Sequence, residues 1–200
     1  MRQSEIRRKI EISPAFVAVL CAYFYFDPAG TFFPFLLAVT LHEAGHLITL
    51  RLLKSEIHSL RFELCSATIH TAPMPYLQEL LAALAGPAVN LVLFLCCSRQ
   101  FPKFALVNFC LLFYNLLPFY PLDGGRALRA LLHLLLEEQV ATIIERIIAA
   151  LCLAMLTALC CYLTCVWHAG LWPVLVCALL LLRIAGTILP ERKRAQFFPG

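Results

Sequence analysis

The sequence predicts an all-α membrane protein with about six transmembrane helices. Of the 200 residues, 62% are hydrophobic and only 14% are charged, whereas soluble domains carry nearer a quarter charged residues. Apolar stretches close to the roughly 20 residues that cross a bilayer recur along the whole chain. A fold in water could not cover so much apolar surface, so lipid is the expected solvent.

The predicted spans follow one another with little chain between them. The first is short and could be extended by Ile10 and Ile12, and the fourth is interrupted by proline. The first is an anchor rather than a cleavable signal, because further spans follow it directly. We expect one membrane domain over residues 1–200, without a PDZ or CBS domain. The spans are residues 13–26, 31–53, 76–97, 104–120, 140–167 and 170–189.

The connection between the second and third spans has a different pattern. Residues 59–64 alternate polar and apolar side chains, which is the period of a strand with one buried face. Residues 67–71 could return beside them, so the segment is either a short β-ribbon or an amphipathic connector. The free edge of a ribbon, near residues 60–64, could pair with an extended peptide.

Basic residues predict the orientation of the spans. Twelve Lys and Arg residues flank the spans on one side, and only Arg99 and Lys103 lie on the other. Loops rich in Lys and Arg stay in the cytoplasm, so both termini should be cytoplasmic, as in a multi-pass protein of a bacterial cell membrane. This bias accounts for the net charge of +4, and no nucleic-acid partner is needed to explain it.

The second span carries the strongest chemical signal, the pattern His42-Glu43-Ala44-Gly45-His46. Positions i and i+4 share one face of a helix, so both imidazoles can reach one metal ion. Glu43 lies beside the first ligand, where it can take a proton from water at the metal. Ionisable residues inside a span are costly and indicate function. Two alternatives are histidines that only hydrogen-bond neighbouring helices, and histidines that bind haem, which leaves Glu43 without a role.

Asp123 is the candidate third ligand, since catalytic zinc commonly has three protein ligands and one open position. It follows Pro118 and Pro121, which cannot continue a regular helix. It also precedes two glycines that permit sharp bending. Asp123 could instead cap the following helix, and taken alone that is the more common role. Beside the HExxH pattern, we favour the ligand.

The third span contains Gly86-Pro87-Ala88-Val89-Asn90. A Gly-Pro pair kinks a helix and lets another helix approach closely. Asn90 adds an amide at this point. It has either a role near the site, in substrate binding, or a packing role with one interhelical hydrogen bond, and the sequence leaves both open.

Together, HEAGH, GPAVN and Asn115-Leu-Leu-Pro-Phe-Tyr-Pro-Leu-Asp123-Gly-Gly resemble, in this order, the motifs of the site-2 protease family of intramembrane metalloproteases. The motif core covers about residues 31–126. The resemblance implies one zinc ion per chain held by His42, His46 and Asp123, with Glu43 as the catalytic base. It also implies that Asn115 holds the substrate or polarises its carbonyl.

The resemblance implies that the chain is an intramembrane zinc endopeptidase. Its expected substrates are membrane-spanning or membrane-tethered proteins, cut near the cytoplasmic side of the bilayer. The short first anchor looks most like the sporulation-type members from Firmicutes, which release a transcription factor by regulated proteolysis. The alternative function is a membrane protein that binds a metal or haem without hydrolysis. The sequence indicates neither the individual substrate nor the oligomeric state.

Overall fold

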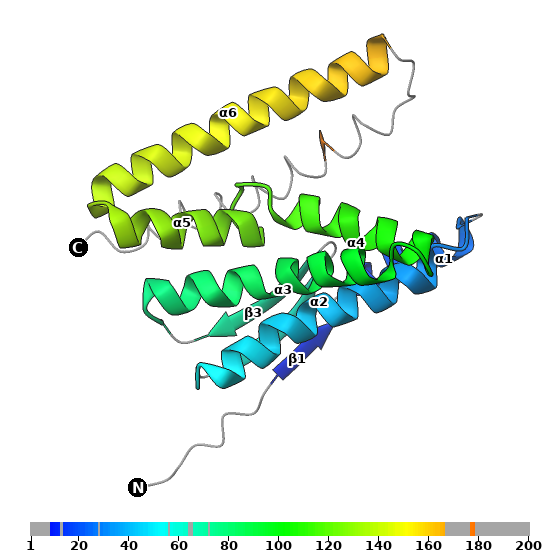
Figure 1. Ribbon diagram of the computed structural model, residues 1–200, viewed down its shortest axis with the longest axis horizontal. Helices are drawn as coiled ribbons and strands as arrows, with labels where there is room; N and C mark the ends of the chain where they lie inside the picture. The colour runs from blue at the N-terminus through cyan, green and yellow to red at the C-terminus, as the bar shows by residue number, and fades with distance from the viewer. Residues whose placement is uncertain are drawn as a thin grey trace, which may run out of the picture. The chain divides into compact units, whose positions relative to one another are not determined.

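The structure is a computed structural model, and it describes residues 9–12, 14–27, 29–55, 57–63, 66–71, 73–166 and 177–178. The chain divides into two compact units, residues 1–115 and 116–200. The elements appear in Figure 1 in the order β1 (Lys9–Ile12), α1 (Pro14–Tyr25), α2 (Phe32–Leu52), β2 (Ile57–Glu63), β3 (Ser66–Thr71), α3 (Tyr76–Cys97), α4 (Pro102–Asn115), α5 (Asp123–Leu135) and α6 (Glu138–Cys165).

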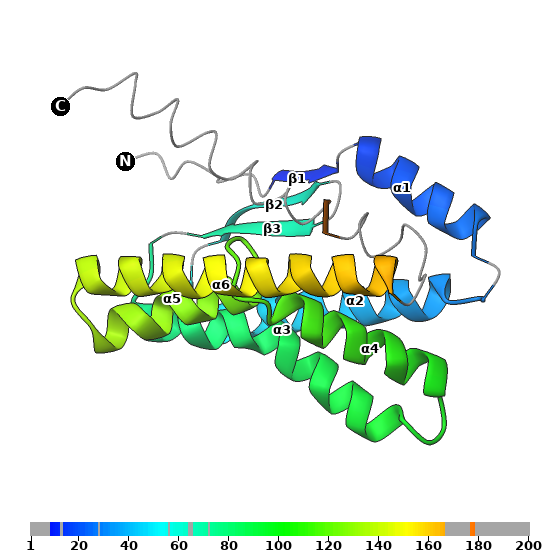
Figure 2. The same cartoon turned by 90° about the horizontal axis from the view of Figure 1, so that it is seen from above.

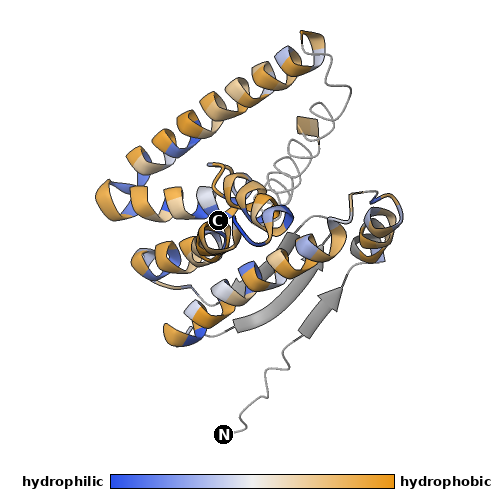
Figure 3. Ribbon diagram, turned by 45° about the vertical axis from the view of Figure 1, so that its right-hand side comes forward, coloured by the Kyte–Doolittle hydropathy of each residue, from blue (hydrophilic) through white to orange (hydrophobic). Residues whose placement is uncertain are grey.

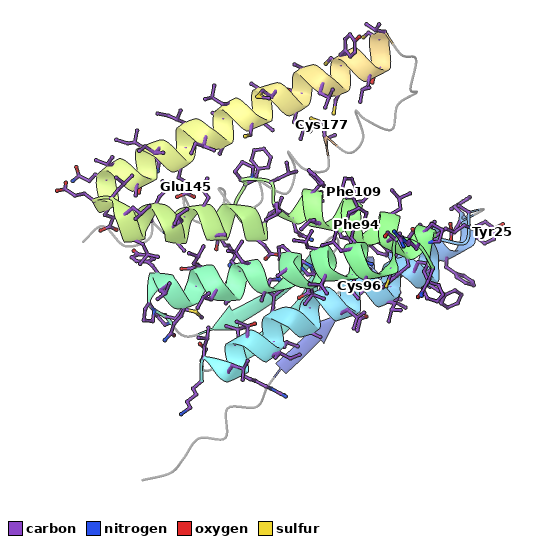
Figure 4. The ribbon with its side chains drawn as sticks, in the orientation of Figure 1. Tyr25, Phe94, Cys96, Phe109, Glu145 and Cys177 are labelled. Atoms are coloured by element: carbon purple, nitrogen blue, oxygen red, sulfur yellow. The ribbon has the colours of Figure 1, made fainter. Side chains whose placement is uncertain are left out.

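Helices α2, α3 and α4 pack side by side in the first unit (Figure 1). Small residues let α2 and α3 approach closely. A Cβ atom on Gly45 would lie 2.8 Å from Cγ2 of Val89 and 3.1 Å from the carbonyl oxygen of Ala85, so a larger residue would push the helices apart. Between α3 and α4, the rings of Phe94 and Phe109 pack with centroids 5.0 Å apart (Figure 4).

The three strands form one sheet in the order β1-β2-β3. β2 and β3 pair antiparallel, with Leu60 opposite Ile69, in the two segments where the sequence alternates. β1 adds to β2 in parallel, with Ile10 opposite Leu60. Figure 2 shows the sheet alongside the helices of this unit, and β2 also contacts α1.

Strand β1 corrects two predictions. Ile10 and Ile12 do not extend the first helix, because residues 9–12 are extended and paired with β2. The edge of β2 is not available to an added peptide either, because β1 occupies it over Ser59–Phe62. The Lys9-Ile10-Glu11-Ile12 segment alternates charged and apolar residues, which is the strand period that should have identified it.

The long predicted spans agree with the helices, and the short ones do not reach span length. α3 has the predicted bounds, and α2 and α6 lie within two residues of theirs. α1 has 12 residues and α4 has 14, both below the roughly 20 that cross a bilayer. The span predicted to reach residue 120 is wrong beyond Asn115, where α4 ends. Span 170–189 lies outside the described residues, apart from Cys177 and Ala178, which are helical.

Three of the described helices, α2, α3 and α6, are long and apolar enough to cross a membrane. Large apolar side chains stand exposed on them, for example Phe33 of α2 at 69%, Leu95 of α3 at 63% and Met155 of α6 at 72%. Figure 3 shows the same property as the hydrophobic colour that covers most of these helices. Such surfaces are stable in lipid and not in water, so the chain is an integral membrane protein.

The second unit contains α5 packed against α6. Unlike the spans, α5 is amphipathic, with Arg126, Arg129 and His133 among its apolar residues. The guanidinium carbon of Arg129 lies 6.0 Å from the ring centroid of Tyr120, at the outer limit for a cation–π contact. Charge of this kind explains why α5 forms a separate helix and does not continue a span.

Candidate metal centre

Two buried histidines of α2 point their Nε2 atoms at each other. His42 is 4% exposed and His46 is 5% exposed, and they lie one helical turn apart. Their ring planes are inclined by 80°, and the two Nε2 atoms are 3.2 Å apart. Two nitrogens bound at about 2.05 Å to a tetrahedral zinc ion are about 3.3 Å from each other. The pair therefore has the spacing of two neighbouring ligands of one ion.

One face of α3 supports both histidines. Ala82, Gly86 and Asn90 are spaced by four residues and so lie along one side of that helix. The Nδ1 atom of His46 lies 2.7 Å from the carbonyl oxygen of Ala82. Since a carbonyl only accepts, Nδ1–H donates and the Nε2 atom of neutral His46 keeps its lone pair. This is the arrangement found at zinc sites, where the second ring nitrogen is fixed by an outer hydrogen bond.

At the other end of the pair, the Nδ2 atom of Asn90 lies 3.1 Å from Nδ1 of His42. Asn90 is completely buried, and its Oδ1 atom has no hydrogen-bond partner. This contact joins α3 to a histidine ring of α2, so it fits both the role near the site and the packing role with one interhelical hydrogen bond. The substrate-binding role of Asn90 stays a prediction.

Gly86 lies between these two contacts and keeps the space beside the ring nitrogens open. A Cβ atom there would lie 2.6 Å from Nε2 of His42 and would collide with Nε2 of His46. No side chain larger than hydrogen fits while both rings stay in place. Because Gly86 has no Cβ atom, space remains beside both Nε2 atoms, and a small ion bound by them would fit there.

Glu43, the predicted base, and Asn115, the predicted substrate-binding residue, both lie at helix positions of the first unit. Glu43 follows His42 directly on α2 and is half-buried. Asn115 is the last residue of α4 and is also half-buried. Both lie in the first unit, as the histidines do.

Asp123 is the first residue of α5 in the second unit, with 9% of its surface exposed. The N-cap position belongs to Leu122, whose apolar side chain makes no capping hydrogen bond.

A tight turn before α5 positions Asp123. Hydrogen bonds run from Phe119 N to Leu117 O (2.8 Å) and from Leu122 N to Phe119 O (2.7 Å). A Cβ atom on Gly124 would lie 2.7 Å from the Leu117 carbonyl oxygen, and one on Gly125 would lie 2.5 Å from that of Phe119. Both glycines are thus required for the backbone of the turn to lie against the first turn of the helix.

Among the described residues, the candidate metal ligands are His42, His46 and Asp123. Two imidazole nitrogens and one carboxylate oxygen form a donor set typical of catalytic zinc, which leaves a fourth position for water or substrate. The residues present therefore fit a zinc ion.

Two parts of the site were not identified in the sequence as ligand supports. The Ala82 carbonyl is a backbone group, and no residue type marks such a group in a sequence. The spacing of small or polar residues at 82, 86 and 90 was the available signal, since small residues four apart mark close helix contacts in membranes.

Comparisons with known proteins agree with the motifs. The sequence profile described as "Peptidase family M50" matches residues 95–159. A protein of Synechocystis sp. that is named as a candidate zinc metalloprotease is 31% identical over 109 residues, which are 47% of this chain and 29% of that protein. The chain thus spans less than a third of the length of that relative.

A solved structure, the site-2 protease from Methanocaldococcus jannaschii, has the same fold. It is 23% identical in sequence, and the match covers 84% of this chain and 85% of that chain with a TM-score of 0.59. At this identity the likeness concerns the fold alone. Motifs, family profile, relative and fold thus confirm that the chain resembles the site-2 proteases of peptidase family M50.

Proposed function

We propose that the chain is an intramembrane zinc metalloprotease that hydrolyses peptide bonds of membrane-spanning or membrane-tethered proteins. The observation that carries this proposal is the pair of buried Nε2 atoms 3.2 Å apart on a helix long enough to span the bilayer. A metal-ligand pair that is buried in a spanning helix serves chemistry within the membrane. The substrates are therefore proteins whose chain enters the bilayer.

The chain supplies both the ligands and the proton transfer. His42, His46 and Asp123 would hold zinc, which supplies Lewis acidity that lowers the pKa of water and polarises a carbonyl. Glu43, one residue from His42 and only half-buried, takes the proton of the attacking water and passes it to the leaving amine. Asn115 holds the unwound substrate or polarises its scissile carbonyl.

The sheet supports the proposed orientation. β1 precedes α1 and α2, β2 follows them, and the two strands are paired. Both strands therefore lie on the same side of the bilayer. Because α2 is long enough to cross, the segment containing α1 must bring the chain across in the opposite direction. The excess of basic residues identifies this side as the cytoplasm, so the cut falls toward the cytoplasm.

A carrier that binds both histidines to haem is less consistent with this geometry. Two histidines that hold one haem iron approach it from opposite faces of the ring, whereas these two Nε2 atoms lie side by side. A carrier for a small metal ion would have no use for Glu43. The role in regulated proteolysis that releases a transcription factor, as in sporulation, is the biological setting that we propose for the cleavage.

The test combines metal content and cleavage in one preparation. The detergent-purified chain should contain about one zinc per chain, and co-expression with a panel of single-span membrane proteins should yield cleavage fragments from at least one. His46→Ala should lose both zinc and fragments. Stoichiometric haem, or folded protein that takes up no zinc, would contradict the proposal.

A further inference from the structure

We propose that Asn90 is a positioning residue whose side-chain oxygen accepts a hydrogen bond from Nδ1–H of His42 when the metal is bound. It thereby leaves the Nε2 lone pair of His42 available to the ion. The inference rests on the proposed zinc site and extends it to a residue outside the ligand set. It changes the role of Asn90 from substrate binding to control of a metal ligand.

The hydrogen bonds of the two rings indicate which ring nitrogens carry protons. His46 donates from Nδ1 to the Ala82 carbonyl oxygen, so its Nε2 atom has no proton. The 3.2 Å contact between the Nε2 atoms is a hydrogen bond when Nε2 of His42 carries a proton and donates it to neutral His46. In that tautomer Nδ1 of His42 is an acceptor, and the Asn90 amide nitrogen, 3.1 Å away, donates to it.

Metal binding reverses this requirement. Both Nε2 atoms must then offer lone pairs to the ion, so the proton of neutral His42 has to be on Nδ1. A protonated Nδ1 needs an acceptor, and the side-chain amide of Asn90 lies within hydrogen-bond distance of it. Asparagine can fill both roles, because its amide carries an acceptor oxygen and a donor nitrogen that exchange places when the group turns by half a rotation.

The surroundings of Asn90 permit this rotation. The residue is completely buried, so water does not compete for its amide, and its Oδ1 atom has no hydrogen-bond partner. No second bond therefore fixes the amide with its nitrogen toward His42. A buried acceptor without a partner is costly, and turning the amide toward a protonated Nδ1 of His42 would give the Asn90 oxygen a donor.

The chain provides a matched control in Asn108 of α4. Asn108 is also completely buried, and its Oδ1 atom also lacks a partner. Its amide nitrogen, however, donates to the carbonyl oxygen of Phe104 in its own helix. Replacing Asn108 removes an equivalent buried amide from the same unit without breaking the hydrogen bond between Asn90 and His42.

The experiment measures the zinc dissociation constant of the full chain in detergent by competition with a chelator. Loss of an outer partner of a zinc ligand typically weakens binding by about 10- to 100-fold, and we expect this for Asn90→Leu. Asn90→Asp, which can only accept from Nδ1–H, should restore affinity to near the unsubstituted value. Asn108→Leu should leave it unchanged.

Other outcomes separate the two proposals. Equal affinity in the unsubstituted chain and Asn90→Leu overturns the role of Asn90 alone, and so does an Asn90→Asp variant that binds zinc more weakly than Asn90→Leu. If the unsubstituted chain takes up no zinc, the proposed function fails, and this role fails with it. Should Asn90→Leu not fold, 15N spectra of the zinc-loaded chain decide. The His42 ring, assigned by comparison with His42→Ala, must show a protonated Nδ1, and an unprotonated Nδ1 overturns the role.

Discussion

Replacing Gly86 with alanine adds one methyl group beside the two ring nitrogens, where the structure leaves no room for it. The new carbon would lie 2.6 Å from Nε2 of His42 and would collide with Nε2 of His46, whereas ordinary contacts begin near 3.4 Å. Either the rings turn away or α3 withdraws by more than about 0.8 Å, the difference between those two distances, because the clash with His46 is closer still. Both movements also disturb the 2.7 Å hydrogen bond from His46 to Ala82.

The size of the effect follows from this overlap. Overpacking by one methyl group typically costs about 1–3 kcal/mol. If zinc binding has to pay that cost, the dissociation constant should rise by about 5- to 150-fold, since each 1.4 kcal/mol is a factor of ten. Chelator competition on the purified protein measures the change directly, without need of a substrate.

Gly45→Ala is the matched control, because it adds the same methyl group to the same helix contact. Its Cβ atom would meet Cγ2 of Val89 and the Ala85 carbonyl oxygen rather than the ring nitrogens. It should lower thermal stability while changing zinc affinity less than Gly86→Ala does. If both variants bind zinc with the affinity of the unsubstituted chain, or if both lose affinity equally, the local argument for Gly86 is refuted.

Three further predictions use different measurements. Glu43→Gln cannot accept a proton at neutral pH, so cleavage should fall by about 10²- to 10⁴-fold while zinc content stays normal, and full cleavage by this variant would remove Glu43 from the mechanism. Reporter fusions at the two ends of the chain should both report cytoplasm, and an external signal from either end would contradict the span count. Desolvation raises the pKa of Asp27, but hydrogen bonds from Phe32 N–H and the Thr31 hydroxyl outweigh it, so the pKa lies below its ordinary value of 3.8. The carboxylate therefore stabilises the fold above that value and loses this contribution as the pH falls through the lowered pKa. The difference in thermal midpoint between the unsubstituted chain and Asp27→Asn should shrink over that acidic range, and a constant difference would contradict the assignment.

The parts of the fold that follow from sequence are those set by long, uniform patterns. The apolar run at 76–97 is as long as a helix that crosses the bilayer, and α3 has those bounds. The run at 104–120 was misjudged because its apolar character continues past Asn115, although Pro118 lies in a turn with only local backbone hydrogen bonds. Proline chemistry there outweighed hydropathy.

The site divides in the same way. The i, i+4 spacing of His42 and His46 dictates a shared helix face whatever surrounds it, and the structure places the rings together. The partners of those rings depend on how α3 is aligned along α2. That alignment is a tertiary property, set here by close contacts at Gly45 and Gly86. Neither the Ala82 carbonyl nor the Asn90 amide could therefore be assigned to a particular histidine in advance.

The pairing of His46 with Ala82 and of His42 with Asn90 has a consequence for folding energetics. The two contacts run in opposite directions along the antiparallel helices, and sliding α3 by one turn would break both. Because only the correctly aligned pair offers both Nε2 atoms with their lone pairs free, zinc would bind that alignment selectively. A ligand that binds one arrangement selectively stabilises it by RT ln(1 + [L]/Kd), where [L] is the concentration of free ligand. The metal that serves the chemistry would thus also stabilise the alignment of α2 and α3, and removing it with a chelator would remove this stabilisation.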